Sequence, residues 1–185
     1  MPGSLSWRAL VTARALFALA LPGFLTISAC NGHREERGAT KKATGATVAR
    51  SRVKPQLTRR AEPKAPLEQF VQQHVEEADA SGMRVLVYVG ATWCEPCKRF
   101  HKALESGQLD DALAGTKFIE FDWDRDGTEL RAAGYAGQYI PLFSVPDQSG
   151  HASGRAIEGS VKGDGAVSED LVPRLLALLD GRPTL

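Results

Sequence analysis

The sequence predicts an α/β fold in which a small mixed β-sheet carries helices on both faces. Two observations lead to this prediction. Short apolar runs rich in β-branched residues alternate along the chain with segments whose apolar residues recur at helical spacing. The chain has 185 residues, 43% of them hydrophobic and 24% charged, which is enough for one globular core with some tail left over.

The predicted folded domain comprises residues 67–185 and reads αβαβαββα. Apolar residues repeat every three or four positions from Leu67 until Ser81 and Gly82 end the first helix. The continuous apolar run 85–89 is typical of a central strand covered on both faces. The remaining elements are a helix at 95–104, a strand at 117–121, a helix at 128–136, a strand at 142–145, a short edge strand at 156–158 and a last helix that starts near Asp170. This order predicts a parallel pair of strands followed by a returning hairpin.

Residues 1–29 have the features of a targeting segment. Two arginines precede an apolar run, 15–25, that is too short to span a bilayer comfortably, and small residues lead up to Cys30. The stretch Ile27-Ser28-Ala29-Cys30 resembles the cleavage site of bacterial lipoproteins. This resemblance implies that Cys30 is acylated and becomes the N-terminus of a membrane-anchored protein, because two acyl chains hold a protein stably at a membrane.

Residues 30–66 are predicted to form a flexible basic tether that begins with the lipidated cysteine. Segment 31–66 holds ten Lys or Arg against three acids and few bulky apolar side chains, so it cannot bury enough surface to offset its conformational entropy. The domain that follows has the opposite balance, with eleven bases and nineteen acids. This acidic balance gives no electrostatic reason to bind nucleic acid.

Redox chemistry is indicated by the stretch from Trp93 to Lys98, which reads Trp-Cys-Glu-Pro-Cys-Lys. Cys94 follows a strand at the start of a predicted helix, and Cys97 lies one turn further on the same face, so the pair can close. The helix dipole favours a thiolate at Cys94, the nucleophile of thiol–disulfide exchange. Pro96 suits a first helical turn because its missing N–H has no partner there. We expect Cys94 to attack a substrate disulfide and Cys97 to resolve the mixed disulfide.

Together with Tyr139-Ile140-Pro141 ahead of a later strand, this motif resembles the thioredoxin superfamily over roughly residues 67–185. The resemblance implies a thioredoxin-like fold with a cis peptide bond before Pro141. It also implies that Ile140 pairs through its backbone with an extended substrate and that Pro141 shapes the groove. Trp93, directly before the first cysteine, is expected to contact the substrate as well.

The sequence departs from the family pattern near the cysteines. Many thioredoxins have a buried Asp six residues before the first cysteine, where this chain has Tyr88, so another base or water would have to serve the second thiol. Glu95 disfavours a thiolate, whereas Lys98 and Arg99 favour one. Leu142 replaces a usual Thr, which suggests a specialised branch of the family.

Two metal interpretations compete with the redox interpretation. Cys94, Cys97 and His101 could bind copper or zinc, with His74 or His151 as a fourth ligand, but the flanking Trp and Lys favour redox chemistry. The acids of segment 122–127 imitate the start of a calcium loop. The Glu that should end this loop is missing, so these acids are interpreted as turn and helix-start residues. Trp123 within this segment is expected to pack at the domain edge.

The sequence therefore predicts a lipid-anchored thiol:disulfide oxidoreductase of the cell envelope that faces the periplasm or the exterior. Its partners are expected to be protein or peptide disulfides, and, for a reductase, a thiol donor in the membrane. We expect a monomer that needs no cofactor. The alternatives are a metallochaperone that uses Cys94, Cys97 and His101, and a thioredoxin-fold binding module whose disulfide does not cycle.

Overall fold

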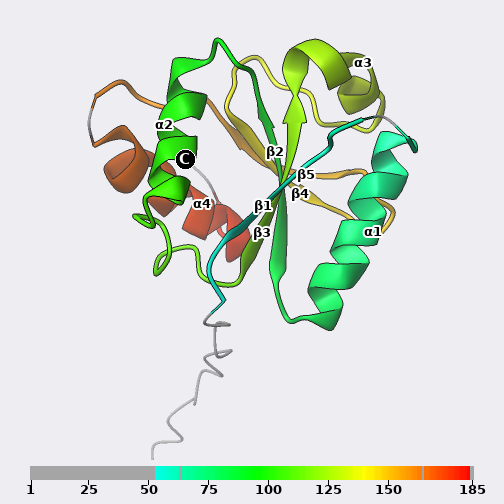
Figure 1. Cartoon of the computed structure of the whole chain (residues 1–185), viewed down its shortest axis with the longest axis horizontal. Helices are drawn as coiled ribbons and strands as arrows, with labels where there is room; N and C mark the ends of the chain where they lie inside the picture. Colours follow the sequence, from blue (N-terminus) through cyan, green and yellow to red (C-terminus); the bar gives the residue numbers. More distant parts are fainter. Residues whose placement is uncertain (1–52, 63, 164, 184–185) are drawn as a thin grey trace, which may run out of the picture. The chain divides into compact units, whose positions relative to one another are not determined.

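Five strands form one mixed sheet in the order β1-β3-β2-β4-β5 (Figure 1). The computed structural model describes residues 53–62, 64–163 and 165–183. The predicted signal peptide (1–29), the predicted lipidation site Cys30 and the tether up to residue 52 lie outside the described residues. Within the described ranges, no helix is both long enough and apolar enough to cross a membrane.

The sheet confirms the predicted parallel pair and the returning hairpin. β2 and β3 are parallel, β4 runs antiparallel to β2, and β5 runs antiparallel to β4. An additional strand, β1, lies parallel to β3 at the edge. The strands are β1 (Gln56–Arg59), β2 (Arg84–Gly90), β3 (Thr116–Asp122), β4 (Leu142–Pro146) and β5 (Ala152–Glu158).

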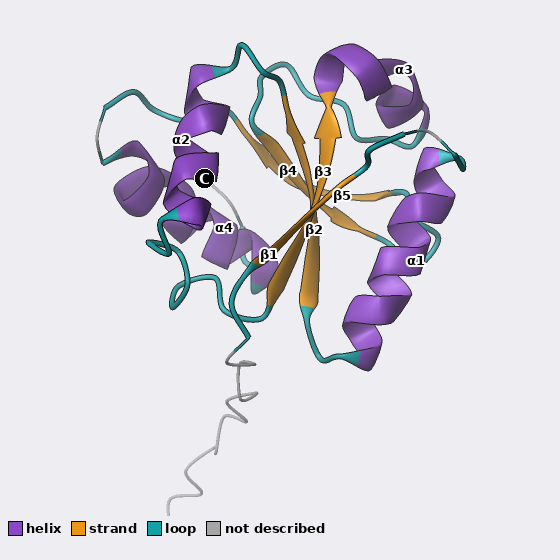
Figure 2. Cartoon of the chain, in the orientation of Figure 1, coloured by secondary structure: helices purple, strands orange, loops and turns teal. Residues whose placement is uncertain are grey.

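Helices cover both faces of the sheet, as predicted. Figure 2 shows the strands between a layer formed by α1 and α3 and a layer formed by α2 and α4. Side chains alternate along β2, so that Leu86 and Tyr88 join the core under α2 while Val87 and Val89 join the core under α1. The helical elements are α1 (Leu67–Ala80), α2 (Glu95–Glu105), α3 (Trp123–Ala132), a π-helical segment η1 (Ala166–Leu171) and α4 (Val172–Leu179).

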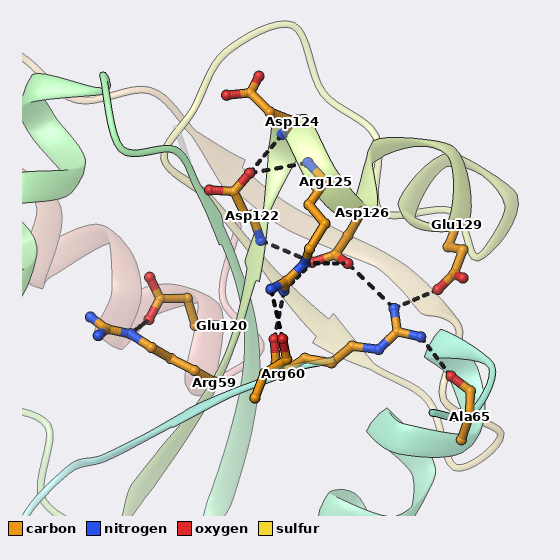
Figure 3. A network of polar contacts seen from close by, with 10 residues as sticks. Arg59, Arg60, Ala65, Glu120, Asp122, Asp124, Arg125, Asp126 and Glu129 are labelled. Carbon is orange, nitrogen blue, oxygen red and sulfur yellow. Dashed lines mark hydrogen bonds and ion pairs between the residues drawn. The ribbon is translucent and has the colours of Figure 1, made fainter. Parts of the chain in front are cut away.

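The prediction that the flexible tether continues to residue 66 is wrong, because β1 lies within it. Arg60, directly after β1, is only 2% exposed and forms ion pairs with Asp126 and Glu129 of α3 (Figure 3). Arg125 in turn donates to the backbone carbonyl of Arg60. An edge strand needs only one hydrogen-bonded neighbour and can expose polar side chains, so low hydropathy did not prevent this segment from folding.

The third helix begins and ends earlier than predicted. Asp122 caps its N-terminus by accepting hydrogen bonds from the backbone N–H groups of Asp124 (2.9 Å) and Arg125 (3.1 Å). The helix ends at Ala132, and Gly134 then has a φ of 83°, which favours glycine. The acids of segment 122–127 thus act as helix cap and ion-pair partners. β5 is also longer than predicted, since it begins at Ala152.

Candidate active site

Cys94 and Cys97 form a disulfide at the start of α2, with an S–S distance of 2.02 Å and a Cα–Cα distance of 5.3 Å. Cys94 is the N-cap residue, and its Sγ accepts a hydrogen bond from the backbone N–H of Cys97 at 3.3 Å. Pro96 occupies the first turn, as its chemistry requires. The prediction that the pair can close is confirmed, while the separate roles of the two thiols stay predictions.

Both cysteines are nearly buried, with 3% of Cys94 and 1% of Cys97 exposed. Cys94 lies at the N-terminal end of α2. Backbone N–H groups and the positive end of the helix dipole favour a thiolate there. The side chain of Arg99 donates to Glu95 Oε1 at 2.7 Å. This ion pair offsets the negative charge next to Cys94, which by itself would disfavour the thiolate.

A groove of about 240 Å³ is lined in part by Trp93, the residue directly before Cys94. Trp93 and Ile140 both line it, so the structure brings together two of the predicted substrate-binding residues. The peptide bond between Ile140 and Pro141 is cis, as the resemblance implied, and Pro141 is buried. Trp93 and Tyr139 are 62% and 65% exposed. We call this the aromatic groove; its lining is Trp93, Trp123, Gly137, Gln138, Tyr139, Ile140 and Leu142.

Side chains of α3 contact both tryptophans of the groove, one from the first turn of the helix and one from the last. Trp93 Nε1 donates a hydrogen bond to Asp124 Oδ2 at 2.8 Å. This bond holds the exposed indole ring in place. The guanidinium of Arg131 lies 4.6 Å from the centre of the Trp123 ring. Trp123 packs against both apolar cores, as expected for an edge residue, and it also forms part of the groove wall.

A second cavity, of about 530 Å³, lies where the parallel strands β1, β2 and β3 end. We call it the strand-end cavity. Cavities at the carboxyl ends of parallel strands are common ligand sites in α/β folds. The cavity contains bases and acids from several elements, and its lining is Arg59, Arg60, Ala61, Gly90, Ala91, Thr92, Lys98, His101, Glu120, Asp122 and Arg125.

Glu120 is a carboxylate near the cysteines that was not predicted from the sequence. It lies opposite Tyr88 in the register of β3 and β2. Burial favours its neutral form, but contacts with His101 and Arg59 outweigh burial and keep the pKa of Glu120 below its usual value. Arg59 Nε donates to it at 2.5 Å, and His101 Nε2 lies 2.9 Å away at an angle poor for a hydrogen bond. The sequence did contain a signal for this carboxylate, because Glu120 is the only acid within the predicted strand 117–121.

The histidines considered as metal ligands have other neighbours. His101 faces Glu120, His74 lies 2.8 Å from Glu77 Oε2, and the ring of His151 lies 3.1 Å from the Ser149 hydroxyl. Cys94 and Cys97 are bonded to each other. In the part of the chain that the structure describes, no three Cys, His, Asp or Glu side chains are placed to hold a metal ion.

Part of the sequence is similar to known proteins. Residues 66–147 match a family model described as thioredoxin-like. Among solved structures, a Trichomonas vaginalis thioredoxin is 21% identical, with 68% of this chain and 97% of that chain covered and a TM-score of 0.45. Oxidised thioredoxin O1 from Arabidopsis thaliana is 15% identical, covering 70% and 97% of the two chains with a TM-score of 0.40. No curated protein matches the sequence. Residues 66–147 are thus thioredoxin-like in sequence, and the predicted fold class is confirmed.

Proposed function

We propose that this protein is a thiol:disulfide oxidoreductase whose redox centre is the Cys94–Cys97 pair. The observation that carries the proposal is the disulfide at the N-terminus of α2, directly after Trp93, which lines the aromatic groove together with the exposed Tyr139. Reversible thiol–disulfide exchange needs a thiolate, a second thiol within bonding reach and a surface that binds the substrate. Three features support the proposal: two cysteines within bonding reach, a helix N-terminus that favours a thiolate at Cys94, and a groove that could hold a substrate.

In the reduced protein, the Cys94 thiolate attacks one sulfur of a substrate disulfide. A mixed disulfide forms between Cys94 and that sulfur, and the other substrate sulfur leaves as a thiolate. Cys97 then loses its proton and attacks Cys94 Sγ. The Cys94–Cys97 disulfide forms, the second substrate sulfur leaves, and both substrate thiolates take up protons from solvent. The substrate gains two electrons and the cysteine pair loses two.

The aromatic groove is suited to an extended peptide. Ile140 lines the groove. We propose that its backbone pairs with a strand-like peptide, a mode of binding that depends little on the peptide's sequence. Trp93 and Tyr139 provide exposed ring surface for apolar side chains next to the substrate cysteine. We therefore propose protein or peptide disulfides as the substrates.

We further propose that the protein works outside the cytoplasm and is held to a membrane by acyl chains on Cys30. The small residues before Cys30 and the preceding apolar run support this location. A reductase in an oxidising compartment must itself be reduced, and a thiol donor in the membrane is the proposed source of electrons. Labelled fatty acid should be incorporated into the wild type and not into Cys30→Ser; equal labelling of both would overturn the anchor.

A trapping experiment tests the redox function. In a Cys30→Ser background, Cys94 and Cys97 are the only thiols left of the three cysteines. With a disulfide-containing peptide, reduced Cys97→Ser should accumulate a mixed disulfide at Cys94, visible by mass and reversed by dithiothreitol. Cys94→Ser is the matched control and should form far less adduct. Equal adducts in both variants, or normal turnover by Cys97→Ser, would contradict the assigned roles.

A further inference from the structure

The buried hydroxyl of Tyr88 lacks a hydrogen-bond partner among the residues that the structure describes. The Tyr88 side chain is fully buried. Its ring packs against Phe100 at 5.1 Å and stacks on Phe143 at 5.0 Å, so aromatic contacts hold it in place. Burying a hydroxyl without a partner destabilises a fold, whereas Phe would keep the same ring contacts without this penalty. A buried tyrosine at this position is therefore explained best if its hydroxyl has a hydrogen-bond partner in another state of the protein, such as the reduced state.

The hydroxyl oxygen of Tyr88 and the sulfur of Cys97 both lie close to Gly90. A Cβ atom placed on Gly90 would lie 2.7 Å from the Tyr88 oxygen and 3.4 Å from Cys97 Sγ. Because Gly90 has no side chain, no atom of Gly90 fills the space between the Tyr88 oxygen and Cys97 Sγ. A disulfide sulfur accepts hydrogen bonds weakly, but a thiolate is a charged acceptor and binds a hydroxyl donor strongly.

We propose that, when the disulfide is reduced, the Tyr88 hydroxyl donates a hydrogen bond to Cys97 and stabilises its thiolate. This inference rests on the proposed redox function and adds a positioning residue to it. Tyr88 occupies the position at which many thioredoxins have the buried Asp. It acts as a donor and keeps its own proton, because burial, reinforced by the charge of Glu120, raises the pKa of Tyr88.

In the resolving step, Cys97 loses its S–H proton to solvent, and the Tyr88 hydroxyl stabilises the thiolate that remains. The Cys97 sulfur bonds to Cys94 Sγ, the bond from Cys94 to the substrate breaks, and the departing substrate thiolate takes up a proton from solvent. The strand-end cavity, which Gly90 lines, offers the proton a route to solvent. After the step, the Tyr88 hydroxyl is again without an anionic partner.

The test compares Tyr88→Phe with Tyr135→Phe in the full chain carrying Cys30→Ser. Tyr135 is a matched control, because it is similarly buried but donates to the carbonyl oxygen of Gly150 at 2.8 Å, in the core on the other face of the sheet. Loss of the Tyr88 donor removes stabilisation from the reduced state alone. We expect Tyr88→Phe to lower the equilibrium constant for reduction of the disulfide about tenfold, equivalent to a potential about 30 mV more negative. Tyr135→Phe should leave the potential unchanged and lower the melting temperature.

A second measurement separates this inference from the proposed function. In Cys94→Ala, Cys97 is the only thiol of the same background, and its alkylation rate can be followed against pH. Adding Tyr88→Phe should move the midpoint of that profile to higher pH. The charged groups that face Tyr88, namely Glu120 from β3, Arg59 from β1 and His101 from α2, are the same in both variants. An unchanged potential together with an unchanged profile would overturn the role of Tyr88, whereas failure of the parent protein to cycle would overturn the redox function.

Discussion

Arg60 and Asp126 form an ion pair in which both side chains are almost fully buried, at 1% and 2% exposure, with 3.5 Å between Arg60 Nη1 and Asp126 Oδ1. Arg60 also donates to Glu129 and to the carbonyl oxygen of Ala65 (Figure 3). The pair joins the segment that follows β1 to α3, the helix whose first turn holds Trp93 through Asp124. The chain before α1 is thereby connected, through α3, to the wall of the aromatic groove.

Replacement of Arg60 should be strongly destabilising. Arg60→Met removes the ion pair with Glu129 and one of the two ion pairs of buried Asp126, which keeps its contacts with Arg125 and with the backbone N–H of Asp122. Breaking a buried pair from one side costs about 3 kcal/mol or more of unfolding free energy. Urea unfolding measures this loss. Arg182→Met is the control, because the Arg182 side chain is 61% exposed and its surface pair is worth only about 0–1 kcal/mol. Equal losses in the two variants would refute the anchoring role of Arg60.

The start of the stable domain can be tested with two fragments. A fragment of residues 53–185 keeps β1, whereas one of residues 67–185 exposes the edge of β3 and removes Arg59 and Arg60. We expect the shorter fragment to unfold at a lower urea concentration and to aggregate more readily, since an open strand edge invites pairing with other chains. If both fragments have the same midpoint and solubility, β1 does not stabilise the domain.

The hydrogen bond between Trp93 and Asp124 should affect substrate binding more than redox equilibrium. Asp124→Ala frees the exposed indole ring while leaving both cysteines and the helix cap Asp122 in place. We expect KM for a peptide disulfide to rise roughly threefold, as for the loss of one modest hydrogen bond. The reduction potential should not change. A shifted potential with an unchanged KM would show that Asp124 acts on the cysteines instead.

Acid should weaken a charge cluster between α1 and β3. Hydrogen bonds from Lys117, His74 and Gln73 lower the pKa of Glu77 from the usual 4.5 to about 2. Because the folded state holds this carboxylate ionised, its contribution is present above pH 4.5 and is lost as the pH falls towards 2. Glu77→Gln should therefore be less stable than the wild type at pH 7, with the difference shrinking across this window.

Urea unfolding at pH 7, 4 and 2.5 checks the contribution of Glu77. The Glu77 side chain is 47% exposed, so salt should reduce the difference between the two proteins. Glu76→Gln is the matched control, because Glu76 lies next to Glu77 on the same helix and accepts an exposed hydrogen bond from Gln72. If Glu77→Gln and Glu76→Gln differ from the wild type equally at every pH, the cluster adds no stability.

Local sequence signals were sufficient for the elements around the cysteines. The β-branched run of β2 and the helix-start signals of α2 predicted a cysteine pair that can close, and the Pro141 motif predicted a cis peptide bond; the structure has both features. Features that depend on contacts between distant residues could not be predicted in this way. β1 is polar, and its pairing with β3 shows in no local pattern. Glu120 becomes part of the site only because sheet register sets it opposite Tyr88. The early start of α3 depends on the cap that Asp122 provides.

The most direct test of the central claim is an equilibrium redox titration of the Cys94–Cys97 pair in the Cys30→Ser protein, read by thiol alkylation and mass across defined dithiothreitol and glutathione buffers. We expect one reversible two-electron transition, in which both thiols are alkylated together, at a potential near the roughly −270 mV typical of thioredoxin. A much higher potential would indicate an oxidant or isomerase in place of a reductant. A pair that does not exchange reversibly with either buffer would contradict the oxidoreductase function itself.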